Sequence, residues 1–99
     1  MPLAIDPAGK EIRALQDVMD WKGKRLLEIG CGDGRLTLRL AAFGPASIEA
    51  IDPDPKRIRL ARSSLPRSES RRVKFHVGHA EKLRYPNATF DAVVFAWSL

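Results

Sequence analysis

Leu27-Glu28-Ile29-Gly30-Cys31-Gly32-Asp33-Gly34 is the stretch that decides the fold of this 99-residue chain. It begins inside a short, mostly apolar run, Arg25 to Ile29, that is typical of a buried strand. It ends where a second apolar segment, bounded by Gly34 and Gly44, suits a helix of about ten residues with a glycine stop. Glycines at alternate positions allow a tight turn and the close approach of a ligand, and the free amides of a helix start favour anionic groups.

The alternation of strand and helix continues along the chain. Apolar and alternating patterns predict strands at about 25–29, 47–51, 72–77 and 90–97, and helices at about 7–20 and from Asp54-Pro55 to Leu65. Strands that alternate with helices form a parallel sheet with right-handed crossovers. We therefore expect a single Rossmann-like, doubly wound α/β domain over residues 1–99, with ligands at the carboxyl ends of its strands.

Composition restricts the class of protein. A content of 44% hydrophobic and 29% charged residues in 99 positions is typical of one globular domain and excludes two. No apolar run approaches the ~18 residues of a membrane span, and the amino terminus lacks the basic flank and apolar core of a signal peptide, so we expect a cytoplasmic protein. Cys31 is the only cysteine, which excludes an internal disulfide and a cysteine-based zinc site, and no metal site is predicted.

Positive charge is concentrated in one segment. The chain has a net charge of +5, and the block from Lys56 to Lys74 holds eight basic residues against a single acid, Glu69. Such a block attracts phosphates through counterion release, so nucleic acid is a candidate partner of a small α/β module without catalysis. A solvated helix face and loop is the alternative, because no aromatic residue within the block is available to stack on bases.

Asp52 complements the glycine turn. It ends the second predicted strand 22 residues after Gly30, close to the offset of ~20 residues at which an acid meets ribose hydroxyls in doubly wound folds. A carboxylate accepts two hydrogen bonds and so suits a vicinal diol. A helix N-cap is the alternative role for Asp52. A nucleotide-dependent oxidoreductase is disfavoured, because Arg35 stands where the dinucleotide fingerprint requires glycine or alanine.

Four motifs in order give the chain from Trp21 onward a family resemblance. They are Glu28-Ile29-Gly30-Cys31-Gly32-Asp33-Gly34, Asp52-Pro53, Gly78-His79-Ala80-Glu81-Lys82-Leu83 and Phe90-Asp91-Ala92-Val93-Val94. In this order and spacing the chain resembles the class I S-adenosylmethionine-dependent methyltransferases, in particular the group with a generic methyltransferase-type domain. The resemblance implies S-adenosyl-L-methionine as cofactor and a methyl acceptor of unidentified class.

The resemblance also implies roles for individual residues. Glu28 would orient the glycine loop and help to hold the amino group of the cofactor, and Asp52 would take both ribose hydroxyls. The other cofactor-binding positions that it implies are Gly30, Cys31, Gly32 and Gly34 around the methionine and ribose, and Pro53, His79 and Ala80 around the adenine. His79 departs from the family, which often has an acid there. Because an imidazolium cannot accept a hydrogen bond, we expect adenine affinity to fall as the pH drops.

The resemblance implies a larger whole. The family sheet has seven strands in the order 3-2-1-4-5-7-6, and this chain would supply the first four, in the order 3-2-1-4. We therefore expect a truncated domain, inactive alone, with Ala92 to Trp97 as an unpaired edge that favours self-association. Trp97 and Ser98 are the candidates for contact with the acceptor, and no catalytic residue is assigned. We expect no chemistry at Cys31, at His76 within a strand, or at Asp91, which lies at the amino end of its strand.

Overall fold

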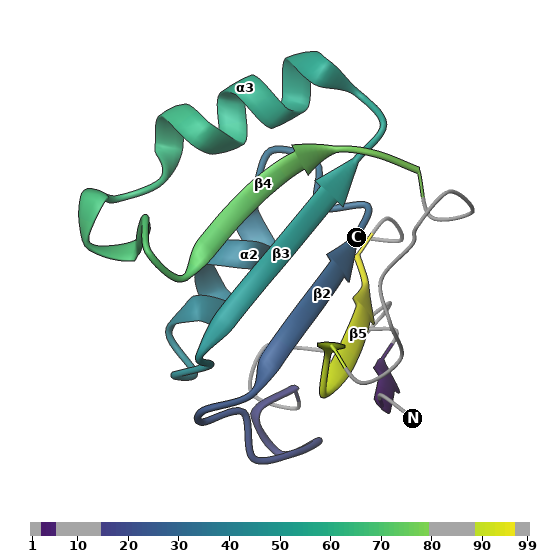
Figure 1. Ribbon diagram of the computed structural model, residues 1–99, viewed down its shortest axis with the longest axis vertical. Helices are drawn as coiled ribbons and strands as arrows, with labels where there is room; N and C mark the ends of the chain where they lie inside the picture. Colours follow the sequence, from purple (N-terminus) through teal and green to yellow (C-terminus); the bar gives the residue numbers. More distant parts are fainter. Residues whose placement is uncertain (1–2, 6–14, 80–88, 97–99) are drawn as a thin grey trace.

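The computed structural model describes residues 3–5, 15–79 and 89–96. These residues form one parallel sheet of five strands in the order β1-β5-β2-β3-β4 (Figure 1). The strands are β1 (Leu3–Ile5), β2 (Arg25–Ile29), β3 (Ser47–Asp52), β4 (Val73–Val77) and β5 (Ala92–Phe95). The helices are α2 (Arg35–Ala41), α3 (Pro55–Ser64) and a short 3₁₀ helix, η1 (Arg67–Glu69). The four predicted strands and their order 3-2-1-4 are therefore confirmed as β4-β3-β2-β5.

A strand that the sequence did not predict covers the expected free edge. β1 pairs in parallel with β5, with Leu3, Ala4 and Ile5 opposite Ala92, Val93 and Val94 (Figure 1). The expectation of an unpaired edge over Ala92 to Trp97 is thus wrong for 92–94. A three-residue strand is too short to show the alternation by which strands are recognised in a sequence, and its partner lies at the far end of the chain.

Local hydrogen bonding explains where the helices end. α2 is shorter than predicted because Ala42, Phe43 and Gly44 donate to carbonyls three residues back, which tightens its end into a turn. Of the helix predicted over 7–20, only 15–20 is described; residues 15 and 16 are helical and a turn follows, so the helix does not reach Asp20. The indole of Trp21 and the amide of Val18 both donate to the carbonyl of Leu15 at this turn.

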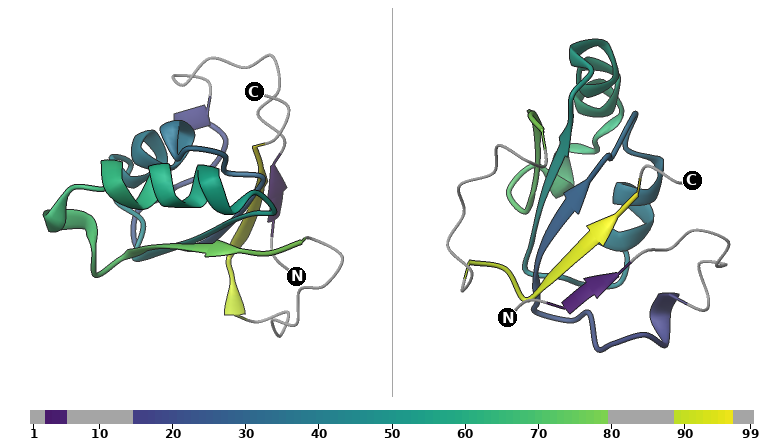
Figure 2. Two further views of the ribbon diagram at one scale, coloured as in Figure 1. Left: turned by 90° about the horizontal axis from the view of Figure 1, so that it is seen from above. Right: turned by 90° about the vertical axis from the view of Figure 1, so that its right-hand side faces the viewer.

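α3 begins as its sequence predicts. Asp54 is the N-cap, and its carboxylate accepts from the amide of Lys56 at 2.9 Å while Pro55 occupies the first helical position. Both α2 and α3 lie on one face of the sheet (Figure 2). There they bury the main core, which includes Leu26, Leu40, Ile48, Ile58 and Val94. The described residues of the opposite face form a smaller cluster of Leu27, Ile29, Ile51 and Phe90, flanked by Val93 and Phe95.

Candidate functional site

The glycine loop after β2 adopts backbone angles that few other residues tolerate. Gly30, Gly32 and Gly34 have φ values of 80°, 57° and 88°, in the left-handed region. Gly34 is also sterically required, because a Cβ there would lie 3.1 Å from the ring of Phe75 and 3.2 Å from the Cβ of Ala61. Its hydrogen side chain lets the start of α2 pack against α3 and β4. The alternate glycines therefore serve both the turn and the packing.

Hydrogen bonds hold the loop against the carboxyl end of β3. The amides of Gly30 and Cys31 both donate to the carbonyl of Ile51, at 2.8 and 2.9 Å. The amide of Gly32 donates to Oδ2 of Asp52 at 2.9 Å, and the amide of Asp54 donates to Oδ1 at the same distance. Asp52 is only 8% exposed and joins two loops. It does not cap α3, so the alternative role as N-cap falls to Asp54 instead.

A buried carboxylate lies beneath the loop. Glu28 is 0% exposed, and its Oε1 accepts a hydrogen bond from the hydroxyl of Thr37 on α2. Oε2 has no hydrogen-bond partner among the described residues. Burial raises the pKa of Glu28 to about 7, against the opposing effect of the Thr37 hydrogen bond. Thr37 carried no signal in the sequence beyond its place in a helix, because its role depends on the packing of α2 on β2.

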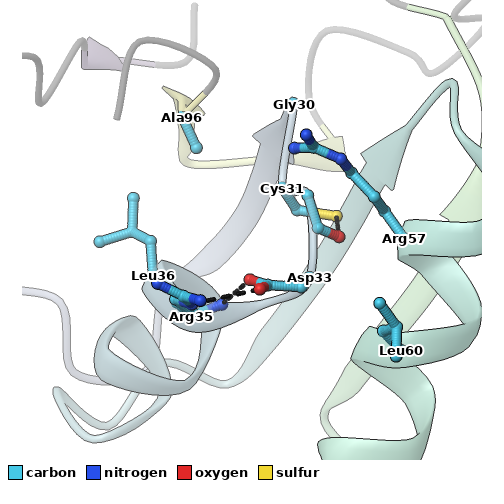
Figure 3. A pocket seen from close by; sticks show the side chains of 9 residues that line it. Gly30, Cys31, Asp33, Arg35, Leu36, Arg57, Leu60 and Ala96 are labelled. Carbon is cyan, nitrogen blue, oxygen red and sulfur yellow. Dashed lines mark hydrogen bonds and ion pairs between the residues drawn. The ribbon is translucent and has the colours of Figure 1, made fainter.

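A cavity of about 460 Å³ opens above the glycine loop (Figure 3). Its walls come from the loop, from both helices and from the end of β5; the lining residues are Gly30, Cys31, Gly32, Asp33, Arg35, Leu36, Arg57, Leu60 and Ala96. Arg57 reaches from α3 toward the loop, and its Nη1 lies 3.4 Å from the position a Cβ would take on Gly32. The sequence places Arg57 in the basic block and does not predict it as a site residue. The signal that could have found it is its position five residues after Asp52, at the start of the helix that follows.

The predicted site residues fall into four groups. Gly30, Cys31 and Gly32 line the cavity, while Glu28, Gly34 and Asp52 support the loop that forms its floor. Pro53 and His79 are exposed and do not line it. Ala80, Trp97 and Ser98 lie outside the described residues. The structure thus brings together the glycine loop of the first motif and Asp52 of the second.

The Cys31 side chain fits the expectation of a residue without chemistry. Its thiol is buried, and burial together with the negative charges of Glu28 and Asp52 raises its pKa far above the ordinary range. A thiol held in the protonated form is a poor nucleophile and a poor metal ligand. The described residues contain no cluster of three or more potential metal ligands.

His76 and Asp91 each contact another side chain away from the loop. Nε2 of His76 lies 2.6 Å from a carboxylate oxygen of Glu49 on the neighbouring strand. Asp91 accepts from the backbone amide of Arg25 at 2.8 Å and pairs with its guanidinium at 3.3 Å. These hydrogen bonds hold the pKa of Asp91 below its ordinary value. Asp91 therefore joins the starts of β2 and β5, at the end of the sheet opposite the cavity.

The basic block covers α3 and the segment that follows it. Arg72 pairs with Glu69 at 2.6 Å, and Arg57 approaches Asp54 at 3.8 Å. Arg62 and Lys74 donate to the backbone carbonyls of Phe75 and Ser70. Four exposed residues of the block have neither an ion pair nor a side-chain hydrogen bond within the described part of the chain: Lys56, Arg59, Arg67 and Arg71. In the same part of the chain, no helix combines the length and the apolar character that a membrane crossing demands.

Comparisons with known proteins agree with this geometry. Residues 26–99 match the family described as a methyltransferase domain. The 27-O-demethylrifamycin SV methyltransferase of Amycolatopsis mediterranei is 35% identical over 78 residues, which are 78% of this chain and 28% of that protein. The ubiquinone biosynthesis O-methyltransferase of Azorhizobium caulinodans is 37% identical over 86 residues, 87% of this chain and 32% of that protein.

Solved structures share the fold. An S-adenosylmethionine-dependent methyltransferase from Mesorhizobium loti superposes with a TM-score of 0.72 at 23% identity, over 85% of this chain and 36% of that chain. The chain spans about a third of the length of the proteins it matches.

Proposed function

Since the chain belongs to the methyltransferase domain family, we propose that its cavity binds S-adenosylmethionine and that the complete protein transfers the methyl group of this cofactor to an acceptor. The observation that carries the proposal is the bond from the Gly32 amide to Asp52, which holds a carboxylate against a residue of the glycine loop that lines the cavity. Neither a simple turn nor a helix cap requires that arrangement.

Asp52 has the capacity to bind a ribose. Each of its oxygens accepts one backbone N–H, from Gly32 and from Asp54. A carboxylate oxygen has two acceptor positions, so among the described residues one position on each oxygen is free for a hydroxyl. The two backbone bonds fix the orientation of the carboxylate before the ligand arrives. This pre-organisation reduces the entropy that binding must overcome.

Glu28 fits the amino group of the cofactor. Its unpartnered Oε2 is fully buried, and a buried acceptor without a donor costs about 1–3 kcal/mol. An ammonium group is a donor of the right charge. Glu28 immediately precedes Ile29, whose carbonyl accepts from the amide of the cavity residue Ala96. A donor that reaches Oε2 would remove this cost.

We assign the adenine to the region of Pro53 and His79. Pro53 follows Asp52 and is exposed, so its ring is available to pack on a base. His79 is exposed and follows Gly78, whose amide donates to the carbonyl of Asp52. Ala80 completes this assignment as a backbone donor. The expected pH dependence of adenine affinity through His79 belongs to the same proposal.

The protein contributes to the reaction by aligning the two reactants and by excluding water from them. The cofactor supplies an electrophilic methyl group on a sulfonium, and alignment of the acceptor with this group can account for about 7–11 kcal/mol of the barrier. Ala96 at the end of β5 lines the cavity. We therefore propose that the next residues, Trp97 and Ser98, lie near the acceptor, whose class stays open because fold and cofactor site do not determine it.

Titration calorimetry with S-adenosylhomocysteine tests the proposal on the full-length protein. Asp52→Ala and Gly32→Val should each abolish detectable binding. Asp91→Asn is the matched control, because this acid lies at the opposite end of the sheet, and its affinity should equal that of the wild type. Urea denaturation of each variant shows whether it is folded. Absence of binding by the wild type, or full affinity in folded Asp52→Ala, would contradict the proposal.

A second candidate is nucleic-acid binding by the basic block. The unpaired exposed charges at Lys56, Arg59, Arg67 and Arg71 favour it. RNA affinity that falls steeply with salt, in a protein without affinity for S-adenosylhomocysteine, would favour this candidate over the first. RNA affinity in addition to cofactor binding would make nucleic acid a candidate acceptor.

Two further proposals concern the cellular location of the protein and its self-association. We propose a cytoplasmic protein, because its single cysteine is a reduced, buried thiol. Self-association through the sheet would use one of the two edge strands of the described sheet, β1 or β4, because β5 lies between β1 and β2. Sedimentation of the full-length protein tests this assembly.

A further inference from the structure

The hydrogen bond between Thr37 and Glu28 joins two fully buried side chains across the first helix–sheet contact. Thr37 lies on α2 and Glu28 on β2, and both are 0% exposed. Glu28 stands in register with Ala50 of β3 and Val94 of β5, which belong to the main core. The carboxylate is therefore surrounded by apolar side chains on its own sheet, and its hydrogen bond comes from the helix above.

The hydroxyl of Thr37 donates its hydrogen bond to this carboxylate. A threonine inside a helix often donates to the carbonyl four residues back. A hydroxyl has one proton, and here it goes to Oε1 of Glu28 instead. The bond leaves Oε2 as the acceptor without a partner among the described residues. Thr37 thus distinguishes the two oxygens of one carboxylate.

We propose that Thr37 is a positioning residue for the cofactor: its hydroxyl holds Oε1 of Glu28 so that Oε2 can accept from the ammonium group of the ligand. The inference rests on the proposed function and assigns it a residue that does not touch the cofactor. It also predicts which property of binding Thr37 controls, namely the pH range in which the site accepts an ammonium group.

Among the neighbours of Glu28, Thr37 is the side chain that counteracts the effect of burial on the pKa of this carboxyl. The neighbouring register partners on β3 and β5, Ala50 and Val94, are not titratable. In the adjoining loop Cys31 is held as a neutral thiol, and Asp52 at the end of β3 directs both oxygens to backbone amides. Burial raises the pKa of Glu28 to about 7, and the Thr37 hydrogen bond acts in the opposite direction. Removal of the hydroxyl should therefore raise this pKa further.

The affinity for S-adenosylhomocysteine, measured by calorimetry between about pH 5.5 and 8.5, tests the inference on the full-length protein. All proteins are compared in a His79→Gln background, which removes the imidazole titration proposed above, and affinity in that background should rise through a midpoint near the pKa of Glu28. In Thr37→Val, which keeps the shape, the midpoint should move up by about one pH unit; affinity near pH 7 is then about five-fold weaker and approaches the wild-type value at the alkaline end. Thr37→Ser keeps the hydroxyl and should retain the wild-type midpoint.

The pH midpoint separates positioning from general destabilisation. A purely structural role would lower affinity by the same factor at every pH, so an unchanged midpoint in Thr37→Val would overturn the inference. A midpoint in Thr37→Ser that matches Thr37→Val would also overturn it. Thr37→Ala replaces Thr37→Val in the same comparison if the latter does not fold. Failure of the wild type to bind at any pH would instead contradict the proposed function.

Discussion

The buried carboxylate makes a prediction about stability that needs no ligand. The pKa of Glu28 rises from 4.5 to about 7 on folding, and each pKa unit corresponds to about 1.4 kcal/mol, so the shift is worth about 3 kcal/mol. The folded state binds the proton more tightly than the unfolded state. This contribution to stability is therefore fully present below about pH 4.5 and is lost as the pH rises through about 7.

Glu28→Gln removes the titration while it keeps the size of the side chain and an acceptor for Thr37. We expect the free energy of unfolding of Glu28→Gln, minus that of the wild type, to increase by about 3 kcal/mol between about pH 4.5 and 8 in the absence of cofactor. Urea denaturation at a series of pH values measures this difference. The absolute offset between the two proteins is not part of the prediction, because the amide N–H groups of glutamine need their own partners.

Asp91→Asn is the matched control. Its hydrogen bonds with Arg25 lower the pKa of Asp91, so the contribution of this carboxyl is lost only in acid, as the pH falls through that lowered pKa. The difference between Asp91→Asn and the wild type should be flat over the range in which Glu28→Gln changes. A flat difference for Glu28→Gln as well would refute the reasoning, because it would mean that Glu28 titrates at the same pH in the folded and unfolded states.

Three further predictions concern the loop, the cavity wall and the linkage between binding and protons. Gly34→Ala should destabilise the protein by about 2–4 kcal/mol, because residue 34 has a positive φ and a Cβ there would press on Phe75. Gly23→Ala should cost only about 1–2 kcal/mol, because Gly23 has a positive φ but open space around it. Thermal unfolding of the two variants measures the difference, and equal losses of stability would contradict the packing role of Gly34. Arg57→Met should change stability by less than about 0.5 kcal/mol because the Arg57 side chain is 63% exposed, and a larger loss in urea denaturation would contradict this. Binding of S-adenosylhomocysteine below about pH 7 should release a proton from Glu28, and binding well above that pH should release no proton. Calorimetry in buffers of different ionisation enthalpy detects the released proton. Uptake of a proton on binding would contradict the contact between Glu28 and the ammonium group.

The local order of elements could be predicted because each carries its own signal. Asp54-Pro55 marks the start of α3, the glycine at 44 follows the end of α2, and the apolar run that ends at Ile29 marks a buried strand. These signals depend on neighbours within a few positions. Parallel pairing and the handedness of crossovers then leave few topologies for a chain in which strand and helix alternate. The order of the four predicted strands follows from that restriction.

Contacts between distant segments could not be predicted in this way. β1 joins β5 across almost the whole chain, and three residues offer no periodicity to detect. Thr37 reads as an ordinary helical residue until α2 packs on β2 and brings its hydroxyl to Glu28. Arg57 reads as one charge of a basic block until α3 places it over Gly32.

The sequence by itself therefore determined the fold family, the glycine loop and the acid at the end of β3, because turns, caps and periodicity are properties of neighbouring residues. Only the tertiary structure decided which oxygen of Glu28 is free, which helix supplies its partner, and which residues wall the cavity. The physical reason is that burial and hydrogen bonding depend on what packs against a side chain. In this protein the groups that set the charge of the site come from segments separated along the chain.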